Sequence, residues 1–325
     1  MPSRPHFQRL ASDARLLPPL AAAVVHPCDA ESLQCALSGA FAGYLAPVLV
    51  GPTARIRATA DAAGLDVSHL PVVDAEDDPR ASCLAAIELA ASGDVRGLIQ
   101  GALRIDDLLA PIAAPDRGLR GERRLSHVHV LDLPGRARPL LVADALLSLH
   151  PNLATKADIL HNTFAFATAL GIREPRAAVL AAVDVVSPAF PSTADAAALR
   201  SMAEEGLFGT ARVAGPLTAD GALAPEAARA SGAPAAAADG FDVLLAPNME
   251  SAALLVRALT AITGGLAAGL VLGARVPIVA PARVDGTEAR MASCVLASLV
   301  AAANRPAVAP RAVAAPAPVA GSVTA

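Results

Sequence analysis

Short runs rich in valine and leucine alternate with longer alanine-rich stretches along most of this chain. The alternation begins with Ala22–His26, a helical stretch over Ala30–Ala42, Pro47–Val50 and a second helical stretch over Arg55–Ala63. A short apolar run fits a strand that is buried on both faces of a sheet, and the stretches between the runs have the periodicity of helices. This order is typical of an α/β fold, in which helices connect parallel strands.

The alternation continues toward the end of the chain. Further strand candidates are Val95–Ile99, His127–Leu131, Leu140–Ala143, Ala177–Ala181, Val243–Ala246 and Val276–Val279. A chain of 325 residues exceeds the usual size of a single domain, so we expect two domains, each with its own core. The fold class that we predict is therefore α/β, with two domains of largely parallel sheets flanked by helices and a cleft between them.

Composition limits both the core and the partners. Hydrophobic residues make up 54% of the chain but aromatic residues only 2%, so the core must be built from alanine, leucine and valine. The formal net charge is -4, from 26 basic and 30 acidic side chains that form no long blocks. A protein that binds nucleic acid needs a basic face for the phosphates. We therefore expect no nucleic-acid partner.

The spacing of cysteine and histidine gives no support for a metal site or a disulfide framework. The chain has 4 cysteines, and none of them forms a CxxC pair, the spacing typical of many zinc sites. His127 and His129 alternate on one strand face, but no third ligand follows. Packed strand histidines are therefore a better interpretation than a metal pair. We expect no metal and a reducing, cytoplasmic environment.

Two apolar stretches resemble segments that enter or cross membranes. Leu16–Val25 follows several arginines, like the core of a signal peptide, but Asp13 and two prolines argue against that interpretation. Leu266–Ala280 is interrupted by Arg275 and Pro277 and is shorter than the roughly 20 apolar residues of a membrane span. We therefore expect a soluble protein without a membrane partner.

Polar side chains follow several of the strand candidates, where sheets of this class bind their ligands. These residues are Asp144, Ser192, Thr193, Asp195, Asp220, Arg283 and Asp285. Arginine offers a planar fork of donors to phosphate oxygens, and a carboxylate can accept a proton from a thiol. Arg283 and Asp285 are thus a candidate anion ligand and acid/base pair, although a solvated surface loop would have the same composition.

The order of the segments resembles the phosphate acetyltransferase/butyryltransferase family from about Leu16 to Val300. The likeness is nearest to the phosphate acetyltransferase module that in some bacteria follows an enoyl-CoA hydratase domain. The segments that carry the likeness are Pro47–Pro52, Gly101 with Asp106–Leu109, Arg123–Val128, Asp132–Gly135, Leu141–Asp144, Lys156–Ile159, Pro191–Ala196, Gly215–Leu217 and Gly273–Ile278.

The resemblance implies a fold of the isocitrate/isopropylmalate dehydrogenase type. One α/β domain would span residues 15–138 and be completed by 286–305, the second would span 139–285, and 306–325 would form a disordered tail. Members of the family are usually homodimers. Their substrates, acetyl-CoA or coenzyme A with phosphate or acetyl phosphate, meet in the cleft between the domains. No cofactor is implied, because coenzyme A is a substrate.

The implied reaction is direct transfer of an acetyl group between coenzyme A and phosphate. A carboxylate, here Asp285, takes the thiol proton; the thiolate attacks the acyl carbonyl, and Arg283 holds the departing phosphate. These two residues are the predicted catalytic pair. The predicted substrate-binding residues are Arg104, Arg124, Asp144, Ser192, Thr193, Asp220 and Glu250.

Several positions depart from the family pattern. Gln100 replaces a lysine, Ala252 and Ala253 follow Glu250 where relatives have Gly-Asn, and Ala282 replaces a serine next to Arg283. One lost donor of this kind can reduce a rate by about 10²-fold to 10³-fold. We expect Arg104 to compensate for part of the lost positive charge.

Three alternatives to a phosphate acetyltransferase stay open. A phosphate butyryltransferase or another short-acyl transferase would differ only in the volume of its acyl pocket. A catalytically degraded homologue would bind coenzyme A or acyl phosphate without turnover. An NAD-dependent decarboxylating dehydrogenase is the least favoured, because the sequence has no matching cluster of metal-binding aspartates.

Overall fold

The computed structural model of the chain describes residues 4–115, 119–224 and 240–304. Its strands are β1 Leu20–Val25, β2 Leu45–Gly51, β3 Val72–Asp74, β4 Gly97–Gln100, β5 Ser126–Asp132, β6 Leu140–Ala143, β7 Arg176–Leu180, β8 Arg212–Leu217, β9 Val243–Leu245, β10 Leu266–Leu272 and β11 Ile278–Val279. They form one 11-stranded sheet in the order β3-β2-β1-β4-β11-β10-β5-β6-β9-β7-β8. The strands at positions that the sequence predicted are present.

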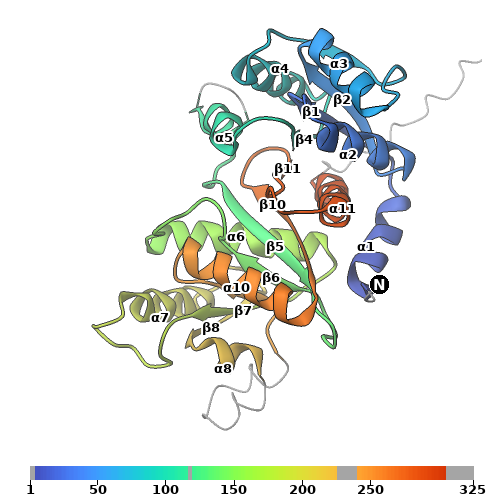
Figure 1. Cartoon of the computed structure of the whole chain (residues 1–325). Helices are drawn as coiled ribbons and strands as arrows, with labels where there is room; N and C mark the ends of the chain where they lie inside the picture. The colour runs from blue at the N-terminus through green and yellow to red at the C-terminus, as the bar shows by residue number, and fades with distance from the viewer. Residues whose placement is uncertain (1–3, 116–118, 225–239, 305–325) are drawn as a thin grey trace, which may run out of the picture.

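The sheet is largely parallel, as predicted. β10 is antiparallel to both β11 and β5, and β5 is antiparallel to β6. The other neighbouring pairs are parallel. The antiparallel strands lie in the middle of the sheet, between an upper half with β1–β4 and a lower half with β6–β9 (Figure 1).

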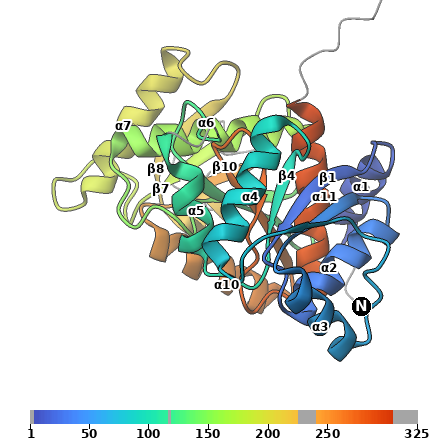
Figure 2. The ribbon, with the colours of Figure 1, turned by 90° about the horizontal axis from the view of Figure 1, so that it is seen from above.

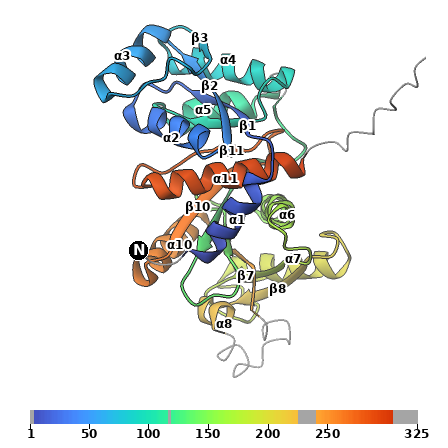
Figure 3. The same ribbon diagram turned by 90° about the vertical axis from the view of Figure 1, so that its right-hand side faces the viewer.

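The helices flank both halves, which confirms the predicted α/β class. They are α1 Pro5–Arg15, α2 Ala30–Phe41, α3 Thr53–Ala63, α4 Pro79–Ser92, α5 Ile105–Ala113, α6 Leu153–Ala169, α7 Pro191–Glu204, α8 Ala219–Leu223, α10 Met249–Thr263 and α11 Thr287–Ala303. Figure 3 shows α11 running across the molecule between the two halves, with α1 beside it. α11 is apolar on most of its faces and its residues 292–301 are buried, as is usual for a central helix.

Polar caps define where several of these helices begin. The side chains of Asp29, Asp78, Asn152 and Asn248 each accept a hydrogen bond from a backbone N–H in the first turn of α2, α4, α6 and α10. Such a cap satisfies one of the free donors at a helix start and contributes about 1 kcal/mol. The caps therefore fix the point at which each strand-to-helix loop ends.

One face of the sheet carries a core that is shared by both halves. It includes Val24 of β1, Val128 and Val130 of β5, Leu141 of β6 and Leu296 of α11. The opposite face has two separate cores. The first joins β1, β4 and β11 to α4 and α5, and the second joins β6, β7 and β9 to α8 and α10. Figure 2 shows α4 and α5 on one side of β4 and α11 on the other.

Three strands were not predicted, namely β3, β8 and β10. β10 lies in an apolar stretch that resembles a membrane span in the sequence. β10 is part of the apolar stretch Leu266–Ala280, and it is a strand paired along its whole length with β5. Within the described ranges, no helix is both long and apolar enough to cross a membrane. The other two, β3 and β8, lie at the two edges of the sheet.

The predicted domain boundaries, 15–138 with 286–305 and 139–285, stay a prediction. β11 falls within the range predicted for the second domain, and it pairs with β4 of the upper half and with β10. The predicted tail, residues 306–325, lies outside the described residues.

Candidate active site

A cavity of about 820 Å³ opens on the face of the sheet where the two separate cores leave a gap. The loop after β4, the loop after β11 and the residues that follow β6 contribute to its walls, and β5 and α10 close it. The cavity thus lies at the carboxyl ends of parallel strands from both halves, which is the usual ligand position in such sheets. The sequence predicted ligand-binding residues at strand ends of this kind, and that this cavity is the site stays a prediction.

The loop after β4 is held against the end of β1 at very short range. The backbone N–H groups of Gly101 and Ala102 donate to the carbonyl oxygens of Val25 and His26, each over 2.9 Å. A Cβ atom on Gly101 would overlap the oxygen of Val25 and lie 2.7 Å from that of His26. Only glycine fits, and this close approach brings Gln100–Arg104 to the wall of the cavity.

Four arginines line the cavity, and they come from four different segments. Arg104 precedes α5, Arg257 lies in α10, Arg283 follows β11 and Arg290 lies in α11. Because guanidinium groups form paired hydrogen bonds with phosphate oxygens, this arrangement can hold an anion with several charges.

Three of these arginines have a carboxylate partner. Arg290 donates to Glu31 over 2.8 Å, Arg104 lies 3.3 Å from the carboxylate of Asp106, and Arg257 lies 3.6 Å from that of Asp285. Arg283 is exposed, and its guanidinium has no carboxylate partner in the part of the chain that the structure describes. It is therefore the arginine that can bind an anion at the smallest cost.

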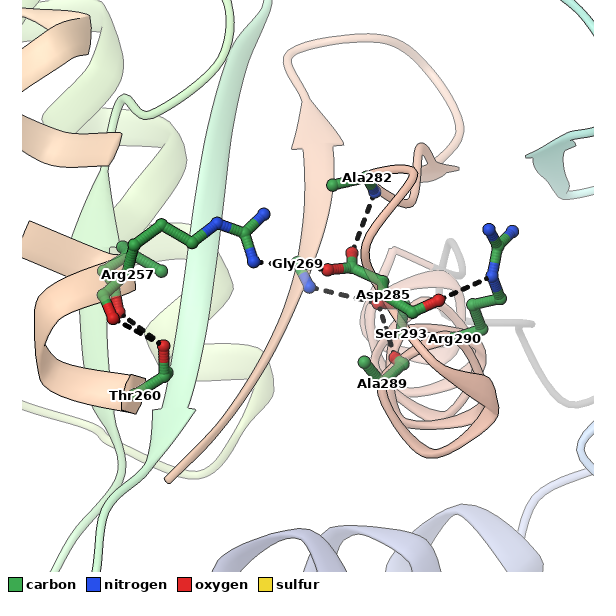
Figure 4. Close-up of polar contacts among 9 residues, drawn as sticks. Arg257, Thr260, Gly269, Ala282, Asp285, Ala289, Arg290 and Ser293 are labelled. Atoms are coloured by element: carbon green, nitrogen blue, oxygen red, sulfur yellow. Dashed lines mark hydrogen bonds and ion pairs between the residues drawn. The ribbon is translucent and has the colours of Figure 1, made fainter. Parts of the chain in front are cut away.

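Asp285 lies in the loop between β11 and α11, and contacts with Ala282, Arg257 and Arg290 hold it in position (Figure 4). Its Oδ2 accepts a hydrogen bond from the N–H of Ala282 over 2.8 Å, and its carbonyl oxygen accepts one from Nε of Arg290 over 3.0 Å. The remaining oxygen, Oδ1, faces Arg257. The carboxylate thus connects α10 of the lower half to the start of α11. Ala282 and Arg283 line the cavity, whereas Asp285 lines an adjoining pocket of about 320 Å³ that shares Glu31 and Arg290 with it.

Two neutral histidines form part of the cavity wall. Val128 and Val130 of β5 point into the shared core, so His127 and His129 point to the opposite face. Their ring centroids are 4.4 Å apart, and Nδ1 of each ring is buried without a hydrogen-bond partner among the described residues. They are packed on one strand face, as predicted, but no feature of the sequence indicated that they lie at the site.

Burial keeps both histidines uncharged at neutral pH. It lowers the pKa of His129 to about 4, with Asp285 opposing the shift and Arg257 adding to it. Burial, and then the neighbouring His129, also lower the pKa of His127 well below its usual value. Next to the arginines, the histidines therefore present a polar surface without further positive charge.

Asp144 shapes the wall rather than forming its surface. It is buried directly after β6, and its Oδ1 accepts hydrogen bonds from the N–H groups of Leu146 and Leu147 over 3.0 and 3.1 Å. Burial raises the pKa of this carboxyl group, while these two hydrogen bonds lower it. The bonds turn the chain so that Ala145 and Leu146 line the cavity.

The structure does not place the other predicted binding residues among the described residues that line this cavity. Arg124 is exposed before β5, and its carbonyl oxygen accepts a hydrogen bond from Asn162 over 2.9 Å. Thr193 is buried in the first turn of α7, where its hydroxyl donates to the carbonyl oxygen of Phe190 over 2.7 Å. Arg104 and Arg283 are thus the predicted residues that the cavity brings together.

Ser192, Asp220 and Glu250 lie in the first turns of three different helices, α7, α8 and α10; Asp220 and Glu250 are exposed and Ser192 is half-buried. The hydroxyl of Thr218 is the main cause that lowers the pKa of Asp220. Acidic residues at such positions stabilise a helix start. A role of these three residues in substrate binding stays a prediction.

Sequence reasoning missed Arg257, Arg290 and the two histidines as site residues. Arg257 and Arg290 lie within helices and far from any strand end, so no local motif marked them. The alternation of β5 was visible in the sequence, but which face would meet a cavity depends on the gap between two cores. That gap is a property of the assembled sheet.

No cluster of three or more histidine, cysteine, aspartate or glutamate residues with the geometry of a metal site occurs within residues 4–115, 119–224 and 240–304. The cavity is lined by four arginines and three carboxylates, and two of these carboxylates, Glu31 and Asp106, are already paired with arginines. The donor set of the site therefore fits an anion.

Comparisons with known proteins identify a family and several proteins that are similar to this chain. Residues 80–298 match the family model described as phosphate acetyl/butaryl transferase. A phosphate acetyltransferase of Rhizobium meliloti is 41% identical over 94% of this chain and 96% of its own length. A phosphate butyryltransferase of Clostridium beijerinckii is 31% identical over 92% of this chain and 99% of its own length.

A solved structure supports the same assignment. The branched-chain phosphotransacylase of Enterococcus faecalis V583 superimposes with a TM-score of 0.76 and 25% identity, and the match covers 87% of this chain and 99% of that one. The family model spans more than half of the chain, and the curated relatives match nearly all of it. The chain therefore belongs to the phosphate acetyltransferase/butyryltransferase family.

Proposed function

We propose that this chain transfers an acetyl group between coenzyme A and inorganic phosphate, and that the reaction takes place in the arginine-lined cavity. The observation that carries the proposal is the convergence of Arg104, Arg257, Arg283 and Arg290 on one cavity at the carboxyl ends of parallel strands. Phosphate and acyl phosphate carry up to two negative charges and need such partners. The 41% identity to a protein named phosphate acetyltransferase supports the same activity.

The volume of the cavity is compatible with two small reacting groups. Ligand pockets usually measure about 300–1,000 Å³, and this one measures about 820 Å³. An acyl phosphate and the thiol end of coenzyme A would meet there, while the rest of coenzyme A extends outward. Holding both groups at short range makes the attack effectively intramolecular, which can supply several kcal/mol of the barrier reduction.

In the proposed mechanism, Arg283 binds the phosphate group and Asp285 accepts the thiol proton. The thiolate sulfur forms a bond to the acetyl carbon, the bond from that carbon to the phosphate oxygen breaks, and phosphate leaves with its charge neutralised by Arg283. The hydrogen bond from Ala282 and the ion pair with Arg257 support this role because they fix the orientation of the carboxylate. The proton leaves Asp285 to solvent or to the released phosphate.

The remaining predicted residues take supporting roles in this proposal. Arg104 supplies a second cation on the opposite wall, and Asp144 keeps Ala145 and Leu146 in position. Arg124, Ser192, Asp220 and Glu250 would contact the parts of coenzyme A that lie outside the cavity, whereas Thr193 is buried and would only hold the first turn of α7 in position.

A butyryl or other short acyl group is the second candidate substrate. Relatives named phosphate butyryltransferase cover most of this chain, at 31% and 34% identity. The comparison of acetyl-CoA with butyryl-CoA separates the two, because each added methylene changes the binding free energy by about 1 kcal/mol. A kcat/KM that is higher for butyryl-CoA would assign the chain to the longer acyl group.

The test of the proposed function is formation of acetyl-CoA from acetyl phosphate and coenzyme A, followed by thioester absorbance. We expect Arg283→Ala to reduce kcat/KM by about 10²-fold to 10³-fold, because it removes the donor that stabilises the leaving phosphate. Arg57→Ala is the matched control, since Arg57 is an exposed arginine of α3, and it should leave the rate unchanged. Binding of coenzyme A without turnover of any short acyl phosphate would instead favour the degraded homologue.

The assembly that we propose is a homodimer in the cytoplasm. Exposed apolar side chains after β6, after β7 and on α10 support an interface between two copies; they are Leu149, Val185, Val186, Phe190 and Leu254. Where such side chains form a contiguous patch, they mark a protein contact. A molar mass of one chain in light scattering would contradict the proposed dimer.

A further inference from the structure

A second cavity, of about 690 Å³, lies at the other end of the lower half of the sheet. It is found where β6, β7 and β8 begin, whereas the first cavity lies beyond the end of β6. Five arginines line it, namely Arg9, Arg138, Arg173, Arg176 and Arg212. None of them belongs to the proposed active site.

The carboxylates near this second cavity, which include Glu174 in its lining, are fewer than its five arginines and neutralise only part of its charge. Asp242 is fully buried, with its Oδ1 3.1 Å from Arg138 and its Oδ2 3.9 Å from Arg176. Arg9 faces Asp13 over 3.9 Å in an exposed pair, which contributes little. Arg173 and Arg212 have no carboxylate within salt-bridge distance among the residues that the structure describes.

The register of β7 and β8 places two of these arginines side by side. Arg176 and Arg212 are directly paired residues at the starts of the parallel strands β7 and β8. Like charges at paired positions of neighbouring strands destabilise a sheet. A bound anion between the two side chains would remove this repulsion, and a polyanion could also reach Arg173 and Arg138 across the cavity.

The walls between the arginines are partly apolar. Pro139, Leu170 and Ile172 line the cavity together with the charged groups. An inorganic anion would not need such contacts, but they fit the carbon skeleton of an organic ligand. The volume of about 690 Å³ lies in the usual range for sites that bind small organic molecules.

The geometry points to a second binding site, in which these arginines hold a compound with two or more phosphate groups, such as pyrophosphate or a nucleoside triphosphate. Arginine pairs with phosphate oxygens through two parallel hydrogen bonds, so several guanidinium groups favour a polyphosphate over a single phosphate. This binding does not depend on the transfer reaction proposed for the first cavity.

The test is isothermal titration calorimetry of the full chain at low ionic strength. Sodium pyrophosphate is titrated first, and ATP in a separate experiment. The double variant Arg173→Ala/Arg212→Ala removes the two arginines without a carboxylate partner. Arg57→Ala is the control for loss of a surface arginine, and Arg283→Ala is the control for binding at the first cavity. Circular dichroism and the Tm verify that each variant is folded.

We expect pyrophosphate to bind and the double variant to lose at least tenfold in affinity at one site, while Arg57→Ala and Arg283→Ala retain that site. ATP should bind at least as tightly as pyrophosphate, because its triphosphate reaches more of the arginines and its nucleoside can contact the apolar wall. Equal affinity in the folded double variant, or complete loss of binding in Arg283→Ala, would overturn the inference. So would the absence of any heat of binding with both ligands.

Discussion

The two arginine-lined cavities differ in how their charges are balanced. In the first, Arg290 is paired with Glu31 in the cavity lining and Arg257 with Asp285 next to it, and two neutral histidines form part of the wall. In the second, a fully buried carboxylate, Asp242, lies behind two of the arginines. Carboxylates at the edge of a cavity can take part in chemistry, whereas a carboxylate behind its arginines can only hold them in place.

The largest effect that this comparison predicts is on the rate of acetyl transfer. Asp285→Asn should lower kcat by about 10²-fold or more, because an amide cannot accept the thiol proton, while its oxygen can still accept the N–H of Ala282. Steady-state rates with acetyl phosphate and coenzyme A measure the effect. Asp61→Asn, at an exposed position of α3, is the control and should leave kcat unchanged. A kcat of Asp285→Asn within threefold of that of the unmodified protein would eliminate Asp285 as the base.

The second prediction concerns stability. Asp242→Asn should lower the free energy of unfolding by about 2–3 kcal/mol, because it leaves Arg138 and Arg176 beside a buried neutral group. Breaking a fully buried ion pair usually costs more than this. Arg138 is half-exposed and can still be solvated by water, which reduces the loss. Urea unfolding measures the change. Asp13→Asn breaks an exposed pair and should cost less than about 0.5 kcal/mol, so equal losses in both variants would refute the structural role of Asp242.

The smallest of the three effects is a pH dependence that arises in the first cavity. The pKa of His129 is about 4 in the folded chain and about 6.5 in an unfolded chain. As the pH falls, His129 therefore binds a proton in the unfolded state before it does so in the folded state. The free energy of unfolding consequently declines between about pH 6.5 and pH 4 and levels off below about pH 4. His129→Gln should remove roughly 1–3 kcal/mol of that decline.

Unfolding curves at several pH values measure this difference. His69→Gln is the control, because His69 is exposed on the surface and should leave the decline unchanged. A His129→Gln variant with the full decline would show that the histidine titrates normally in the folded chain.

Much of the fold was predictable because burial on both faces leaves a clear pattern. β6 was predicted at its observed bounds, Leu140–Ala143. β8 was missed because Gly215 and Pro216 interrupt it, and these residues usually end a strand. β10 was missed because Leu266–Ala280 was considered as one apolar stretch, whereas the strand ends at Leu272, before Arg275 and Pro277 interrupt that stretch.

The first cavity was predictable only where its residues follow strand ends. Arg283 follows β11, and the general position of ligands in parallel sheets was sufficient to propose it. Arg104 follows β4 and was proposed from the resemblance to the family. Arg257 and Arg290 lie inside helices, and His129 looks like any strand residue. The second cavity left no signal, because Arg176 and Arg212 are far apart in sequence and meet only through the register of β7 and β8.

The most direct test of the proposed activity measures acetyl-CoA formation by Arg283→Ala and Arg212→Ala in parallel, with both variants verified as folded. The account predicts that Arg283→Ala loses about 10²-fold or more in kcat/KM, and that Arg212→Ala, in the second cavity, stays within about twofold of the unmodified chain. Full activity of Arg283→Ala, or equal losses in both variants, would contradict the assignment of acetyl transfer to the first cavity.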